Sequence, residues 1–129
     1  MARATARIGT ETYATQIQTS GRSLTADEPE SNGGRDAGPA PYDYLLASLA
    51  ACTVITLRMY ADRKQWPLSS AEAALHFRRD EDGREFIDRV VTLTGALDDG
   101  QVGRLLDICE RTPVTKTLKQ GLAIVTTLG

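Results

Sequence analysis

The chain has few cysteine and histidine residues, which form disulfide bonds and bind structural metal ions. Two cysteines and one histidine, far apart, occur among its 129 residues, which excludes a disulfide framework and indicates neither a metal site nor a cofactor. Its 15 basic and 17 acidic residues give a net charge of −2, so neither a nucleic acid nor a membrane surface is an expected partner. No signal peptide or lipidation motif is recognised. We therefore expect a cytoplasmic protein whose thiols are either core residues or redox groups.

One stretch, PYDYLLASLAACTVITLRMYADRKQW, predicts a long helix from Pro41 to Trp66. Proline suits the first helical position, Asp43 adds a carboxylate to the positive end of the helix dipole, and Pro67 ends the run. The uncharged segment from Tyr44 to Leu57 is too short to span a bilayer. A helix that is apolar nearly all round belongs in a protein interior or at a subunit interface.

Strand patterns lie on both sides of this helix. Ala73, Leu75 and Phe77 alternate with Glu72, Ala74, His76 and Arg78, and Asp82-Gly83 predicts a hairpin turn. After this hairpin, Asp98 and Asp99 open a second helix, in which Val102, Leu105, Leu106 and Cys109 form an apolar stripe. The expected strands are Thr5–Thr10, Thr12–Thr19, Arg22–Thr25, one through Ala73–Phe77, Phe86–Ala96 and a final strand Leu122–Leu128, with a loop at Asp27–Pro41 and a short turn at Val114–Lys119.

The order of strands, helix, strands, helix and strand predicts a single α+β domain over residues 1–129, with antiparallel hairpins and a long helix packed on a sheet. One protomer of this size would struggle to cover so long an apolar helix. We therefore expect a homodimer that shares the helix at its interface.

Cys52 lies in the middle of the long helix, and its reactivity depends on its surroundings. A thiolate is the reactive form, and apolar burial raises the pKa of a thiol. No cation shares its face of the helix, so the helix alone predicts an unreactive core residue. Reactivity requires a cation from elsewhere. Arg22, at the end of a strand, is preferred to Arg35 in the loop.

Three further residues each allow two interpretations. Asp43 lies ~180° round the helix from Cys52; it either partners the helix dipole or holds an arginine over the thiol, across a dimer interface. Cys109 is either a core residue or a resolving thiol, which would need Cα atoms within ~4.4–6.8 Å of Cys52. His76 alternates with the apolar side of its strand, which predicts that it faces solvent; the alternative is a catalytic base.

Three segments together resemble the OsmC/Ohr superfamily, and its short OsmC-like branch most of all. They are LTADEP (Leu24–Pro29), GGRDAGPAPYDYLLASLAACTVITLRMYADRKQWPL (Gly33–Leu68) and RTPVTKTL (Arg111–Leu118). The resemblance implies an intertwined α+β homodimer with active sites at its interface. It also implies reduction of organic hydroperoxides with electrons from an external dithiol. On this basis Cys52 is the peroxidatic cysteine, and Asp43 and Arg22 match the family's acidic and activating residues approximately.

The chain departs from the family at the second cysteine, where the family has a CPVH-like motif. Here Thr112 stands at the cysteine position and Thr115 at the histidine position. Cys109, one turn earlier, is either a displaced resolving thiol or a coincidence. Two functions are therefore expected to compete. One is a thiol peroxidase that uses Cys52, Cys109, Arg22 and Asp43; the other is a redox-silent or one-cysteine dimer that binds a small apolar ligand.

Overall fold

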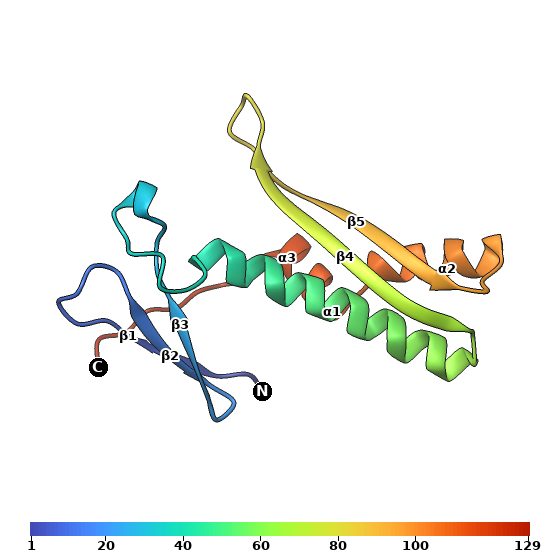
Figure 1. The fold of residues 1–129 in the computed structure, drawn as a ribbon, viewed down its shortest axis with the longest axis horizontal. Coiled ribbons are helices and arrows are strands. Elements are labelled where there is room, and N and C mark those ends of the chain that lie inside the picture. Colours follow the sequence, from blue (N-terminus) through green and yellow to red (C-terminus); the bar gives the residue numbers. More distant parts are fainter. The chain divides into compact units, whose positions relative to one another are not determined.

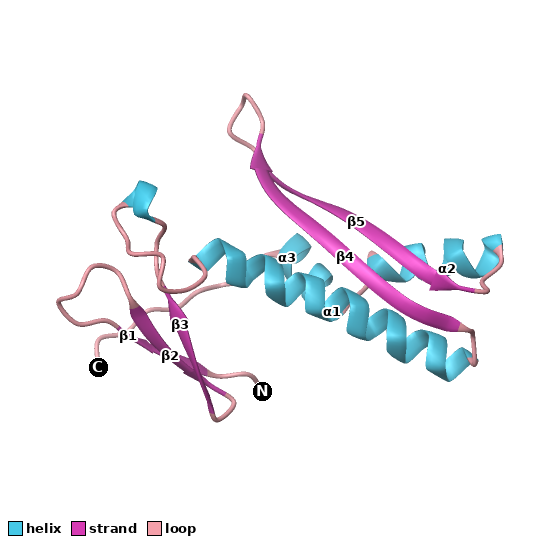
Figure 2. Cartoon of the chain, viewed as in Figure 1, coloured by secondary structure: helices cyan, strands magenta, loops and turns pink.

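The structure is a computed structural model that describes all residues, Met1 to Gly129. The chain divides into two units, Met1–Leu45 and Leu46–Gly129, and each is described by itself. The α+β class is confirmed (Figures 1 and 2). In chain order the elements are β1 (Ala4–Arg7), β2 (Thr15–Thr19), β3 (Arg22–Ala26), the 3-10 turn η1 (Glu30–Asn32), α1 (Pro41–Lys64), β4 (Leu68–Arg79), β5 (Glu85–Gly95), α2 (Asp99–Cys109) and α3 (Pro113–Gln120).

The first unit is built on an antiparallel sheet in the order β1-β2-β3. The turn from β2 to β3 is the pair Ser20-Gly21, between the expected strands Thr12–Thr19 and Arg22–Thr25, and both residues have positive φ, 51° and 71°. Two-residue hairpin turns of this hand match the twist of the strands that they join. The expected return of the chain as a strand from Arg22 is therefore confirmed, and Thr19 lies opposite Arg22.

A buried carboxylate organises the long loop after β3. Asp27 is 2% exposed, and it accepts backbone N–H groups from Glu28, Arg35 and Ala37 at 2.7, 3.2 and 3.1 Å. These hydrogen bonds, above all the one from Ala37, lower the pKa of Asp27. The loop is also closely packed, because a Cβ at Gly34 would lie 1.9 Å from the Glu28 carbonyl oxygen.

Helix α1 begins at Pro41, as predicted, and ends at Lys64, two residues before the predicted end. Gln65 then takes a left-handed conformation (φ 59°), which turns the chain out of the helix. By length and composition alone this helix could cross a membrane, contrary to the expectation from its uncharged run. However, Leu49, Thr53, Leu57 and Ala61 are buried at a spacing of four residues, as in a core helix of a soluble protein.

In the second unit, α1 and α2 pack on one face of the β4–β5 hairpin. The core contains Leu57 and Ala61 from α1, Leu68 from β4, and Leu105 and Cys109 from α2. The alternation predicted for β4 is confirmed, because residues 71, 73, 75 and 77 are half-buried while residues 72, 74, 76 and 78 are exposed. His76 therefore lies on the exposed row.

Two expectations about the end of the chain need correction. The predicted turn at Val114–Lys119 is a complete helix, α3, with Pro113 at its first position and Thr112 as its N-cap. The predicted final strand, Leu122–Leu128, does not form; residues 121–129 are exposed and belong to no helix or strand. A strand exists only where its backbone pairs with a neighbour, and these residues have no such neighbour within the chain.

Candidate functional site

Cys52 lies at the edge of the open side of α1. It precedes the fully buried Thr53 by one residue, so its side chain is ~100° round the helix from the core. Ile55 and Met59, on the open side, are 51% and 59% exposed. Cys52 itself is half-buried, and its Sγ lies 4.0 Å from the Thr56 hydroxyl. The thiol is thus reachable from the surface and belongs to no part of the packed core.

The two residues proposed to activate Cys52 both belong to the first unit. Asp43 accepts the backbone N–H of Ala40 at 3.0 Å and so caps the start of α1. Arg22 is exposed, and its guanidinium donates to the Ser20 carbonyl oxygen at 2.9 Å and to the Ser20 hydroxyl at 3.3 Å. These contacts give each residue a local structural role, while their part in catalysis stays a prediction.

Cys109, the candidate resolving thiol, is the last residue of α2 and is 3% exposed. It packs in the core with Leu57 and Leu105. Burial raises the pKa of this thiol, and the charge of Arg89 only partly opposes that effect. Both cysteines are free. Cys109 would have to leave the core before it could attack another sulfur atom.

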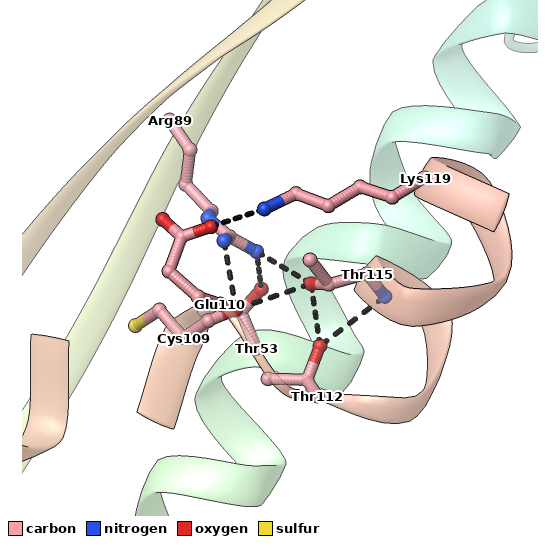
Figure 3. A network of polar contacts seen from close by, with 7 residues as sticks. All are labelled: Thr53, Arg89, Cys109, Glu110, Thr112, Thr115 and Lys119. Carbon is pink, nitrogen blue, oxygen red and sulfur yellow. Dashed lines mark hydrogen bonds and ion pairs between the residues drawn. The ribbon is translucent and has the colours of Figure 1, made fainter. Parts of the chain in front are cut away.

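The structure reveals a polar cluster that the sequence analysis missed. Its centre is Arg89 of β5, whose Nη1 donates to the hydroxyls of Thr53 and Thr115, both at 2.9 Å. Its Nη2 donates to the Cys109 carbonyl oxygen at 2.8 Å (Figure 3). One guanidinium therefore joins α1, the end of α2, and α3 to the strand.

Thr112 and Thr115, the two threonines of the segment Thr112–Thr115, are both buried in this cluster. Thr112 is 0% exposed and Thr115 is 4% exposed. Their hydroxyls lie 2.6 Å apart, and the Thr115 hydroxyl also reaches the Cys109 carbonyl oxygen at 3.2 Å. The segment is thus fully hydrogen-bonded and holds α3 against the end of α2.

The signal for Arg89 was present in the sequence. In β5 the residues at alternate positions, Ile87, Arg89, Val91 and Leu93, share one face, and Arg89 pairs in register with the inward-facing Leu75. An arginine in the apolar row of a two-residue period is unusual, because a buried charge needs partners. That irregularity indicates that Arg89 has polar partners in the interior, beyond the pairing of β5 with β4.

A pocket of about 520 Å³ opens beside this cluster. Its residues come from α1, both strands of the hairpin, the C-cap of α2 and α3, and Arg89 and Thr115 are among them. Lys119 and Glu110 also line it, and they form an ion pair of 2.5 Å. Lys119 lowers the pKa of Glu110. The full lining is Leu49, Phe77, Glu85, Phe86, Ile87, Arg89, Glu110, Thr115, Leu118 and Lys119.

Comparison with known proteins identifies the family. The family model for OsmC-like proteins matches residues 33–127. The chain belongs to the OsmC-like family. No curated protein matches it, so the remaining likenesses are to solved structures.

The OsmC-like fold is shared with several solved structures. An OsmC-like protein from Mycoplasma pneumoniae has a TM-score of 0.78 at 20% identity, over 92% of this chain and 87% of that one. An organic hydroperoxide resistance protein from Legionella pneumophila has a TM-score of 0.69 at 20% identity, over 92% and 89% of the two chains. The organic hydroperoxide resistance protein OhrB of Bacillus subtilis has a TM-score of 0.64 at 23% identity, over 92% and 90%. At these identities the structures establish the fold alone, while the family rests on the match to the family model.

Proposed function

We propose that this OsmC-like protein is a thiol-dependent peroxidase that reduces organic hydroperoxides at Cys52. The observation that supports this proposal is the contrast between the two cysteines: Cys52 is half-buried at the edge of the open side of α1, whereas Cys109 is 3% exposed in the core. The exposed side chains of Ile55 and Met59 make the surroundings of Cys52 apolar, which favours an organic peroxide over hydrogen peroxide. Hydroperoxide resistance in two of the structural neighbours supports the same chemistry.

In the proposed reaction the Cys52 thiolate attacks the outer peroxide oxygen. The O–O bond breaks, an alcohol leaves after taking up a proton, and Cys52 becomes a sulfenic acid. A thiol then condenses with the sulfenic acid to give a disulfide and water, and an external dithiol reduces that disulfide. Arg22 stabilises the thiolate, and Asp43 orients Arg22. Such a cycle suits a reducing compartment such as the cytoplasm.

The condensing thiol is either Cys109 or the external dithiol itself. An internal disulfide needs Cys109, which is 3% exposed and has a raised pKa. A buried, protonated thiol attacks slowly. Burial therefore favours the external dithiol, while local opening at the end of α2 would be needed for Cys109.

We also propose that two copies of the chain form a homodimer through the open side of α1. Ile55 and Met59 are both more than half exposed there, and contiguous exposed apolar side chains mark interaction surfaces. A partner helix packed on this side would cover the exposed side of Cys52 and complete the active site.

Stopped-flow consumption of cumene hydroperoxide with a dithiol tests the peroxidase directly. The protein and its Cys109→Ser variant should both consume peroxide, while Cys52→Ser should not. Equal rates for the protein and Cys52→Ser would refute the proposal. Intact mass after mild peroxide identifies the condensing thiol: an internal disulfide loses about 2 Da, and a lone sulfenic acid gains about 16 Da.

A second candidate is a redox-silent dimer that binds a small apolar ligand. Thr112 and Thr115, at the positions of the family's second cysteine and histidine, favour it because neither hydroxyl can take part in thiol exchange. In that case the intact mass would not change after peroxide, and no peroxide would be consumed.

A further inference from the structure

Arg89 carries a charge that has no carboxylate partner. The seven ion pairs of the structure do not include it, and its partners are two hydroxyls and a carbonyl. A guanidinium has five N–H groups. The three bonds use both hydrogens of Nη1 and one of Nη2. The Nε hydrogen and the second Nη2 hydrogen are therefore left for another acceptor.

The pocket beside Arg89 has walls suited to a hydrocarbon. Leu49, Phe77, Ile87 and Leu118 approach it from four different elements. Its volume of about 520 Å³ falls within the ~300–1,000 Å³ that is usual for small-molecule sites. Few polar groups among apolar walls are also usual for such sites, because they orient the ligand.

The acidic groups of the pocket already have cations of their own. Glu85 pairs with Arg79 at 2.9 Å, and Glu110 pairs with Lys119 at 2.5 Å. The side chains of Glu110 and Lys119 are 59% and 62% exposed, and an exposed pair of this kind contributes only ~0.2–1 kcal/mol. Lys119 can therefore exchange Glu110 for another anion at little cost, and Arg89, whose charge also lowers the pKa of Glu110, has no ion pair to break.

We propose that this pocket binds an amphipathic anion, a carboxylate on an unbranched hydrocarbon chain. The carboxylate accepts hydrogen bonds from the free N–H groups of Arg89 and from Lys119, and Glu110 turns away into solvent. The chain lies against Leu49, Phe77 and Leu118. Cys52 is not among the lining residues, so binding here requires no peroxide chemistry.

Calorimetric titration of the full-length protein with decanoate, below its micelle concentration, tests this site. Decanoate should bind saturably, and decanol and decyltrimethylammonium should bind at least tenfold more weakly. Each CH₂ removed from the carboxylate series should weaken binding about threefold to fourfold, since that is the worth of a buried methylene. Binding should survive Cys52→Ser, which separates this site from the proposed peroxidase.

Substitutions of the charged residues that line the pocket should change the affinity for decanoate in opposite directions. Lys119→Gln should weaken decanoate about threefold, while Glu110→Gln should tighten it, because a competing carboxylate is lost. Lys116→Gln is the matched control, since Lys116 is exposed on the same helix but lies outside the pocket. Arg89→Lys should weaken binding most; if it unfolds the protein, the Lys119 and Glu110 variants still decide. Equal affinity for decanol and decanoate, or no saturable binding of either, would overturn the proposal.

Discussion

The hydroxyl of Thr53 offers the sharpest test of the arginine cluster. Thr53 is 0% exposed; its hydroxyl donates to the Leu49 carbonyl oxygen at 2.7 Å and accepts from Arg89 at 2.9 Å. Thr53→Val keeps the shape of the side chain and removes both hydrogen bonds of the hydroxyl, the one donated to Leu49 and the one accepted from Arg89. A hydrogen bond to a charged group contributes ~1.5–3 kcal/mol, and Arg89 keeps Thr115. We therefore expect Thr53→Val to lower the free energy of unfolding by about 1.5–2 kcal/mol.

The same helix supplies a matched control. Thr56 donates to the Cys52 carbonyl oxygen at 2.7 Å, as Thr53 does to Leu49, but no arginine contacts it. Thr56→Val should therefore cost less than ~0.5 kcal/mol, because valine and threonine have similar helix propensities. In urea unfolding followed by circular dichroism, the midpoints of the two variants should differ by about 0.5–1 M.

Both variants must be compared at one protein concentration, because association shifts apparent stability. If the free energies of unfolding of Thr53→Val and Thr56→Val differ by less than ~0.5 kcal/mol, the hydrogen bond from Arg89 to Thr53 contributes little to stability. The Arg89 cluster would then not be what holds α1 against β5.

Three further outcomes are expected. Cys109 has a raised pKa in the folded chain, so its contribution to stability is complete below the ordinary thiol pKa of ~8.5 and declines as the pH rises above it; urea midpoints from pH 7 to 10 should show a decline that Cys109→Ala reduces. Asp27 has a lowered pKa, so its contribution is present above the ordinary aspartate pKa of ~3.9 and is lost as the pH falls through the folded value; Asp27→Asn should speed amide hydrogen exchange in residues 27–40 at pH 7, whereas the exposed Asp36→Asn should not. Ile55→Glu should halve the mass measured by light scattering, and Leu106→Glu, on an exposed part of α2, should leave it unchanged; a monomeric parent protein would refute the dimer.

Local chemistry was enough to place most of the secondary structure. Pro41 and Pro67 bracket α1, and Ser20-Gly21 forms the turn that its residues favour. The range 122–128 failed for a different reason. Its composition favours a strand, but a strand also needs a partner, and composition does not show whether one is available.

The candidate site was predicted less completely than the fold. Cys52 was singled out from the sequence, but its half-buried position depends on which face of α1 meets the hairpin. The burial of Cys109 depends likewise on the packing of α2. Arg89 could have been found from the two-residue period of β5, whereas its partners Thr53 and Thr115 come from distant helices that only tertiary structure brings together. Arg22 and Asp43 remain predictions.

The threonines around Arg89 have a consequence for a protein that meets oxidants. A hydroxyl neither ionises at physiological pH nor oxidises under conditions that convert thiols to sulfenic acids. With Thr112 and Thr115 both buried, the hydroxyl groups of the Arg89 cluster stay neutral and unoxidised in acid, at neutral pH and under peroxide. Any response of the protein to acid or to oxidants must therefore arise outside these hydroxyl groups, and the contacts that they make between the helices and the sheet stay unchanged during it.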